Sequence, residues 1–263
     1  MMGNTPKFNR PPVIETAIGV SFKPLPSWYT PQFGLYWAQI RKDYSRSEIQ
    51  PPLPLEKEMF GESAREFTLM LGRQVERCWY IDDDNGWLLQ IQNSRFLSNW
   101  RRQPNGVYPS YQRFSKKFFS EWERFNTFLD SEEIERPNPE QVEVSYVNHI
   151  DVDSDMAKLR CVFPDLAGLD RDRAFLSNME AVSFNAVHVI GDNRGRLYFR
   201  LDPVVRHADA KTVMQLSITA NVLVASNEDE ALTEAIDLGH TWVVCGFADF
   251  TSDKKHQEWE RTC

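Results

Sequence analysis

Asp82-Asp83-Asp84-Asn85-Gly86 stands between two runs that favour β-structure, Glu66–Ile81 and Trp87–Trp100. Asn-Gly is a strong signal for a tight turn between antiparallel strands, because both positions tolerate positive φ. A second turn, Gly191–Gly195 (GDNRG), separates strands predicted near Met179–Ile190 and Arg196–Leu201. The two turns predict β-hairpins and therefore antiparallel sheet.

Three further segments predict strands outside these hairpins. Val13–Phe22 has apolar or β-branched residues at alternate positions, which is typical of a strand with one buried face. Val142–Val152 alternates in the same way, and Thr212–Ala225 is the last predicted strand.

Three helices are expected to pack on this sheet. The first, Pro31–Tyr44, has Thr30 as its N-cap candidate and a proline at its first helical position. Pro109–Leu129 repeats aromatic and apolar residues at steps of three and four, which predicts an amphipathic helix. Asp229–Phe250 has Asn227 as its N-cap candidate, with a glutamate three residues further on.

The order of these elements indicates an α+β protein. Residues 45–62 contain three prolines among charged residues and are predicted to form an exposed loop, and residues 153–172 form a polar stretch. Residues 1–152 then give strand, helix, hairpin, helix, strand, the order of a ferredoxin-like unit. Residues 153–263 give antiparallel strands followed by a long helix, which also describes a helix-grip arrangement. We expect the two halves to pack as one compact unit.

Composition argues against nucleic-acid binding, membrane contact and disulfide-bonded secreted proteins. The 263 residues are 41% hydrophobic and carry a formal net charge of -8, so the overall field repels nucleic acid and anionic membranes at long range. The sequence has neither an apolar run of roughly 20 residues nor a secretory signal, which predicts a cytoplasmic protein without membrane contact. Its four cysteines include no CxxC pair and are expected to be free thiols.

Short phrases spread over most of the chain occur in a characteristic order. They are Pro12-Val13-Ile14-Glu15, Gln90-Ile91-Gln92 with Arg95-Phe96 and Asn99-Trp100-Arg101, Tyr108-Pro109-x-Tyr111 before Phe118 and Trp122, Tyr146-x-Asn148-x-Ile150, and His240 with Phe247. In order and spacing they resemble a sporadically distributed family of uncharacterised bacterial proteins, although His149 stands where that family has arginine. The resemblance implies an α+β fold and an association with mobile or defence-related gene clusters. It implies no activity.

One alternating segment could bind a metal ion. His149, Asp151 and Asp153, with Asp155 beyond them, would project from one face of a continued strand, and imidazole with carboxylates suits a divalent cation. The alternative is a solvent-facing strand that runs into an acidic loop.

A second segment could contact nucleic acid or a protein partner, because it interleaves cations with rings. Its candidate residues are Arg95, Trp100, Arg101, Arg102, Arg113, Lys116 and Lys117. The alternative is that the rings belong to a buried stripe and the cations to an ordinary solvated helix surface.

Catalytic signatures are missing from the sequence. Gly191–Gly195 matches neither the GxGxxG nor the GxxxxGK[ST] pattern, and no serine lies in a GxSxG elbow. Cys245 and His240 are five residues apart on a predicted helix, so their side chains would point in different directions. We therefore name no catalytic residue and expect no cofactor.

The primary hypothesis is a non-enzymatic binding, assembly or regulatory component of a bacterial defence or toxin-control system, with another protein, such as a neighbouring effector, as its partner. The first alternative is a nucleic-acid-binding protein that uses Arg95–Lys117. The second is a metal-dependent hydrolase centred on His149 and Asp151.

Overall fold

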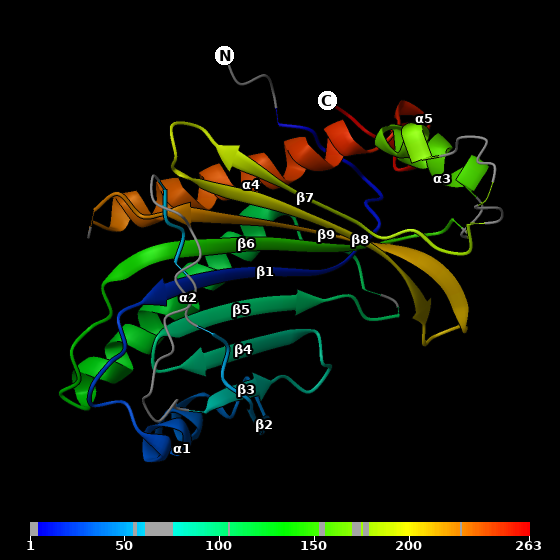
Figure 1. The fold of residues 1–263 in the computed structure, drawn as a ribbon. Helices are drawn as coiled ribbons and strands as arrows, with labels where there is room; N and C mark the ends of the chain where they lie inside the picture. The colour runs from blue at the N-terminus through cyan, green and yellow to red at the C-terminus, as the bar shows by residue number, and fades with distance from the viewer. Residues whose placement is uncertain are drawn as a thin grey trace.

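The computed structural model describes residues 5–54, 57–60, 76–104, 106–152, 156–169, 175, 179–226 and 228–263. Within these ranges the centre of the fold is one antiparallel sheet of nine strands, in the order β2-β3-β4-β5-β1-β6-β9-β8-β7 (Figure 1). The strands are β1 (Val13–Phe22), β2 (Arg46–Gln50), β3 (Arg77–Ile81), β4 (Trp87–Gln92), β5 (Arg95–Arg101), β6 (Pro139–Ile150), β7 (Phe184–Ile190), β8 (Gly195–Arg206) and β9 (Lys211–Leu223). The helices are α1 (Thr30–Ile40), α2 (Tyr111–Ser131), α3 (Met156–Val162), α4 (Asp229–Phe250) and α5 (Asp253–Glu258), with a 3-10 turn at Pro164–Leu169.

The predicted α+β class with an antiparallel sheet is confirmed. The two predicted turns join β3 to β4 and β7 to β8, and both contain an asparagine in the left-handed region, Asn85 at φ 56° and Asn193 at φ 59°. Asparagine tolerates this conformation better than most residues because its short polar side chain bonds locally. The predicted bounds of β1 and α4 are also those of the structure.

The two halves of the sheet repeat one arrangement around a central seam. In the first half β1 is followed by the meander β3-β4-β5 and then by α2, and in the second half β6 is followed by β7-β8-β9 and then by α4. One row of residues across the sheet shows the symmetry: Leu89, Ser98, Ile18, Val144, Ala220 and Leu197. An approximate two-fold axis therefore passes between Ile18 and Val144, where β1 pairs with β6.

The three long helices cover one face of this sheet, which we call the helix face (Figure 1). α4 packs on β6 and β9, and α2 packs on β5. The aromatic stripe predicted for α2 is buried, and Phe114, Phe118 and Phe125 are all fully inaccessible to solvent. Each such ring contributes roughly 1.5–3 kcal/mol of hydrophobic stabilisation when it is fully buried. Burial of this stripe therefore contributes much of the free energy that stabilises the packing of α2 on the sheet.

α4 approaches the sheet closely at two glycines. A methyl group at Gly239 would lie 3.0 Å from Cγ2 of Val144, and one at Gly246 would lie 2.9 Å from Leu197 and Phe199 side-chain atoms. Both are contacts that real side chains rarely make. The glycines thus set the depth at which α4 lies on β6 and β8.

The opposite surface of the sheet, which we call the open face, is lined mainly by polar side chains. It includes Glu15, Asn99, Glu143, Tyr198 and Asn221, which occupy the positions that alternate with the buried residues of their strands. Antiparallel sheets commonly have one apolar and one polar face. Here, however, several of the polar side chains bond one another across strands.

The prediction of a loop over residues 45–62 is wrong at its start, where β2 pairs with β3. β2 is an edge strand with almost every residue exposed, so its sequence carries no hydrophobic alternation. β2 is held in the sheet by backbone pairing with β3, and the pattern of its own side chains does not indicate this pairing.

The single strand predicted over Trp87–Trp100 is in fact two strands, β4 and β5, which turn back at Asn93 and Ser94. Among the described residues between α1 and α2, the first half therefore has four strands rather than one hairpin. The strand predicted over Glu66–Ile81 is confirmed for Arg77–Ile81, and its earlier part, 66–75, lies outside the described residues.

Three helix assignments also change. The stretch read as polar, 153–172, contains α3 and the 3-10 turn, which bury Leu159 and Leu166 against the core. α1 ends at Ile40 and its N-cap is Tyr29 rather than Thr30. The N-cap of α4 is Glu228, without a side-chain hydrogen bond, and the predicted cap Asn227 lies outside the described residues.

The four cysteines are free thiols, as predicted. Among the described helices, none combines the length and apolar character needed to cross a membrane.

Candidate binding cleft

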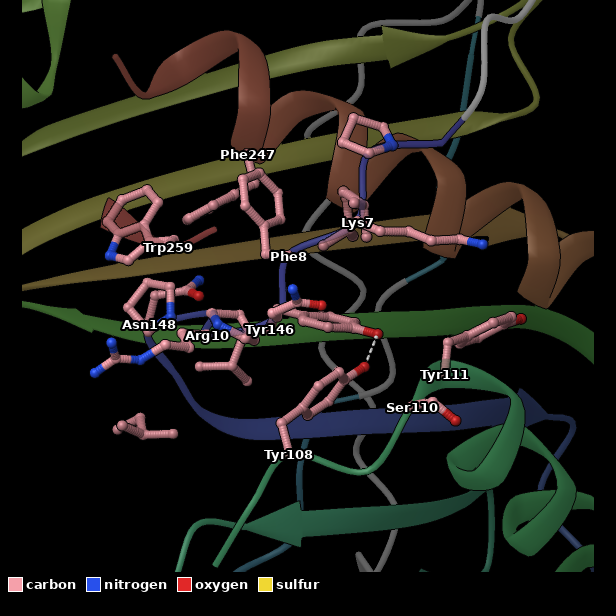
Figure 2. A pocket seen from close by; sticks show the side chains of 18 of the residues that line it. Lys7, Phe8, Arg10, Tyr108, Ser110, Tyr111, Tyr146, Asn148, Phe247 and Trp259 are labelled. Carbon is pink, nitrogen blue, oxygen red and sulfur yellow. Dashed lines mark hydrogen bonds between the residues drawn. The ribbon is translucent and has the colours of Figure 1, made fainter. Parts of the chain in front are cut away.

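A cleft of about 1390 Å³ opens on the helix face, between the N-terminal segment and the helices α2 and α4. Its walls come from residues 5–14, the start of α2, the end of β6, the middle of α4 and the C-terminal segment. Segments far apart in the sequence thus meet here (Figure 2).

Two tyrosine hydroxyls meet inside the cleft. Tyr108 and Tyr146 are joined by a hydrogen bond of 2.7 Å between their Oη atoms, as Figure 2 shows. Tyr108 is positioned by Trp100, whose ring centroid lies 5.5 Å away, and Tyr146 projects from the helix face of β6. Burial raises the pKa of Tyr108 to about 12 and that of Tyr146 well above its ordinary value. Both hydroxyls therefore stay protonated near pH 7, and since only one of them donates within the pair, the other retains a proton for a ligand.

A histidine and a third tyrosine stack beside this pair. The rings of Tyr111 and His240 are nearly parallel, with centroids 3.6 Å apart, and the Tyr111 hydroxyl donates to Asp237 over 2.5 Å. The two residues are brought together because α2 begins beside the middle of α4. Burial lowers the pKa of His240 to about 4, so its imidazole is neutral near pH 7.

The opposite wall is formed where the two ends of the chain meet. The backbone N–H groups of Asn9 and Arg10 donate to the carbonyl oxygens of Glu260 and Trp259, over 3.2 and 3.1 Å. This pairing places the ring of Phe8 edge-on against Phe247 at a centroid distance of 5.5 Å (Figure 2). The N-terminal segment is therefore part of the cleft itself.

The cleft carries charges of both signs at its borders. Arg10, Arg206 and Lys255 contribute positive charge, and Asp151, Asp237 and Glu258 contribute negative charge. Several of these groups are paired with one another, for example Arg206 with Asp151 at 2.9 Å. The pairing of Arg206 with Asp209 lowers the pKa of the Asp209 carboxyl to about 2.

Residues from the phrases that carry the family resemblance converge on this cleft. Its lining includes Tyr108, Tyr111, Tyr146, Asn148, His240 and Phe247. These residues stand out in the sequence through the phrases, but they are too far apart along the chain to indicate a common site. A usable signal was present in β6, where Tyr146 and Asn148 stand between Val144 and Ile150 at positions of the buried face. Polar groups at such positions need a partner or a ligand.

The seven residues proposed for nucleic-acid or partner binding do not form one surface. Arg95 and Arg101 lie on the open face, whereas Trp100 points to the helix face and is 6% exposed. Adjacent residues of a strand face opposite sides of the sheet, which separates Trp100 from Arg101.

The other four of these cations have different surroundings. Arg102 donates to the carbonyl oxygens of Val13 and Pro11 over 2.7 and 3.0 Å, so it holds the chain where β1 begins. Lys117 pairs with Glu121 at 3.1 Å and lies 5.0 Å from the Trp87 ring centroid. Arg113 and Lys116 are exposed on α2.

The residues proposed for metal binding are engaged elsewhere where they are described. Nε2 of His149 lies 3.2 Å from the side-chain oxygen of Gln215, and Asp151 pairs with Arg206. Asp153 lies outside the described residues, as does Asp155. In the described ranges, no three His, Cys, Asp or Glu residues are grouped so that they could hold a metal ion.

No protein-family model matches the chain, and no curated protein matches it.

Proposed function

We propose that the protein is a non-enzymatic binding or assembly component, and that the cleft is where it docks a segment of a protein partner. The observation that carries the proposal is the Tyr108–Tyr146 hydroxyl pair, which lies beside the Tyr111–His240 stack in one cleft. Rings supply apolar area, and their polar tips fix the orientation of what binds, a combination common at protein interfaces.

The protonation states in the cleft favour binding over proton-transfer chemistry. A general acid or base works best when its pKa lies near the operating pH. His240, with a pKa of about 4, is too weak a base, and the raised pKa values of Tyr108 and Tyr146 keep their protons in place. These groups are suited to neutral hydrogen bonds.

The size and charge of the cleft favour a chain segment as its occupant. Its volume of about 1390 Å³ exceeds the roughly 300–1000 Å³ of ordinary small-molecule pockets. Borders with both signs of charge match a peptide with mixed side chains better than a strongly charged small ligand. The family resemblance adds the setting that we propose, a bacterial defence or toxin-control complex, and four free cysteines are in keeping with the cytoplasm.

The test is affinity purification from the native host with tagged wild-type protein and two variants. Tyr108→Phe combined with Tyr146→Phe removes the hydroxyl pair but keeps both rings. Tyr29→Phe is the matched control, because this tyrosine lies outside the cleft and is 60% exposed. We expect one stoichiometric protein that wild type and Tyr29→Phe retain and that the double variant loses.

Two outcomes would count against the proposal. One is a partner that the double variant retains in full. The other is turnover of nucleotide, nucleic acid or peptide by the purified protein alone, at a rate that a single polar substitution abolishes.

A second candidate function, nucleic-acid binding, is supported by one observation on the open face. The guanidinium groups of Arg77 and Arg101 lie 5.5 and 5.2 Å from the centroid of the Trp79 ring. Cations beside a ring are a feature of sites for single-stranded nucleic acid. Salt-dependent binding of single-stranded DNA that Arg101→Glu weakens would support this function, and equal binding by both proteins would exclude Arg101 from it.

A further inference from the structure

Residues 57–60 belong to the connection between β2 and β3, yet they lie against the other half of the sheet. Glu58 is only 8% exposed. Its carboxylate accepts hydrogen bonds from the Arg196 guanidinium, from the Tyr198 hydroxyl at 2.5 Å and from the Asn221 amide at 3.2 Å. Three donors thus converge on one carboxylate.

The backbone around Glu58 is recognised as well. The Glu58 N–H donates to the side-chain oxygen of Gln141 over 2.9 Å, and Nη2 of Arg196 donates to the carbonyl oxygen of Met59 over 2.8 Å. The Phe60 ring lies with its centroid 4.2 Å from the Arg196 guanidinium carbon. The sheet therefore contacts the Glu58 side chain, the backbone of residues 58 and 59, and the Phe60 ring.

The side chains that contact residues 57–60 are brought together on the open face by the register of the strands. Arg196 and Asn221 are direct cross-strand partners, and Tyr198 is two residues beyond Arg196 on the same side of β8. Gln141 reaches in from β6. The pairing of β6, β9 and β8 therefore fixes the backbone positions of these four residues independently of Glu58.

The first half contains a related contact, in which an asparagine of the open face binds a carboxylate that belongs to the sheet itself. By the approximate two-fold axis Asn99 corresponds to Asn221, and its amide donates over 2.8 Å to Glu15. Arg101 lies 3.6 Å from the same carboxylate. Glu15 belongs to β1, which is paired on both sides, whereas Glu58 belongs to no strand. Within the described stretch 57–60 no residue takes part in strand pairing, so release of Glu58 disturbs no strand there.

We propose that Arg196, Tyr198, Asn221 and Gln141 form a binding site for an acidic protein segment, and that Glu58 occupies this site within the chain as a releasable latch. The contacts define the partner's chemistry. It carries a carboxylate with an aromatic residue two positions later, as Glu58 and Phe60 do. This site is separate from the cleft, because it lies on the opposite face of the sheet.

The first test supplies the segment from outside. The probe is the capped tetrapeptide acetyl-Lys-Glu-Met-Phe-amide, which reproduces residues 57–60, and its binding to wild type and to Glu58→Ala is measured by calorimetry. We expect a dissociation constant at least about tenfold lower for Glu58→Ala, because the wild-type site is already filled; a charge-assisted hydrogen-bond set of this kind exceeds that margin. Glu48→Ala, which removes an exposed glutamate of β2, should behave like wild type.

Two controls assign the binding to this site. The same peptide with alanine in place of its glutamate should bind at least about tenfold more weakly, and adding Arg196→Met to Glu58→Ala should abolish binding. Equal affinity for wild type and Glu58→Ala would overturn the proposal, as would absence of binding to a Glu58→Ala protein with native circular dichroism.

The second test uses the intact chain and does not depend on the folding of Glu58→Ala. Hydrogen exchange of the Glu58 amide should accelerate at least about tenfold when the tetrapeptide is present in large excess, because the peptide displaces the latch and frees that amide from Gln141. Unchanged exchange at saturating peptide would show that Glu58 is a fixed structural contact and would overturn the latch.

Discussion

The tyrosine pair in the cleft shows how single hydroxyl groups can matter in a large apolar core. Tyr146 is 6% exposed, so its hydroxyl has little access to bulk water and depends on Tyr108. A buried hydroxyl without a partner costs roughly 1–3 kcal/mol. The hydrogen bond between the two hydroxyls therefore stabilises the fold locally, and the pair is also a candidate contact for a ligand.

Replacing Tyr146 with phenylalanine should lower the free energy of unfolding by about 1 kcal/mol, since it leaves the Tyr108 hydroxyl unpaired. The double variant Tyr108→Phe/Tyr146→Phe should cost less than the sum of the two single changes, because each single change already loses the shared bond. Urea unfolding of the four proteins measures both effects. Strict additivity would show that the hydroxyl pair contributes no coupling.

His240 should make stability depend on pH in a defined window. Its folded pKa of about 4 lies below the ordinary value of 6.5, so between these values the unfolded chain binds the extra proton. The stabilising effect of the neutral imidazole is complete above about pH 6.5 and is lost as the pH falls toward 4.

The comparison that isolates this effect is wild type against His240→Phe, which keeps a ring beside Tyr111 but cannot titrate. Between pH 7.5 and 5 wild type should lose up to about 2 kcal/mol more than the variant, because one pKa unit corresponds to about 1.4 kcal/mol. Urea unfolding at the two pH values gives the difference. Equal losses would show that His240 has an ordinary pKa in the folded protein.

At the scale of single elements, close backbone approaches decide where strands and helices can lie. Gly195 begins β8, and a methyl group there would stand 2.0 Å from the Asn221 carbonyl oxygen of β9. Gly34 lies in α1 with nothing within 4 Å of the same position. A side chain therefore has no room at Gly195 but has ample room at Gly34.

We expect Gly195→Ala to destabilise the protein by more than about 2 kcal/mol, since the clash is with backbone and β8 must move away from β9. Gly34→Ala should instead stabilise it by up to about 1 kcal/mol, because alanine favours the helix. Thermal unfolding of both variants is the measurement. A tolerated Gly195→Ala would mean that β8 and β9 separate at this point at little cost.

For the whole molecule, the continuous sheet joins the two repeated halves through β1 and β6. Ile18 and Val144 are both fully buried at the centre of that seam. Neither half has a sheet edge of its own there, so each covers the other's unpaired backbone groups.

The seam predicts one cooperative unfolding transition. Ile18→Ala should lower the free energy of unfolding by about 2–5 kcal/mol, and Ile49→Ala, on the exposed edge strand, by less than about 0.5 kcal/mol. Circular dichroism, which follows both halves, and tryptophan fluorescence, to which the first half contributes six of eight residues, should shift together. Two separated transitions would contradict the single unit.

What the sequence by itself determined was local. The bounds of β1 and α4, the buried aromatic stripe of α2 and the turns at Asn85 and Asn193 follow from periodicity and turn chemistry, which act over a few residues. β2 escaped prediction because an exposed edge strand is held by its neighbour's backbone rather than by its own side chains.

Only the tertiary structure decided the sites. The cleft joins both chain ends with β6, α2 and α4, and Glu58 is separated from its partners Arg196 and Asn221 by 138 and 163 residues. Such contacts depend on strand order and register, which no local pattern encodes. Side chains alternate between the two faces of a strand, and this alternation made β1 predictable. In β5 it places Trp100 and Arg101 on opposite sides of the sheet, so the cations and rings that are neighbours in the sequence do not form one surface.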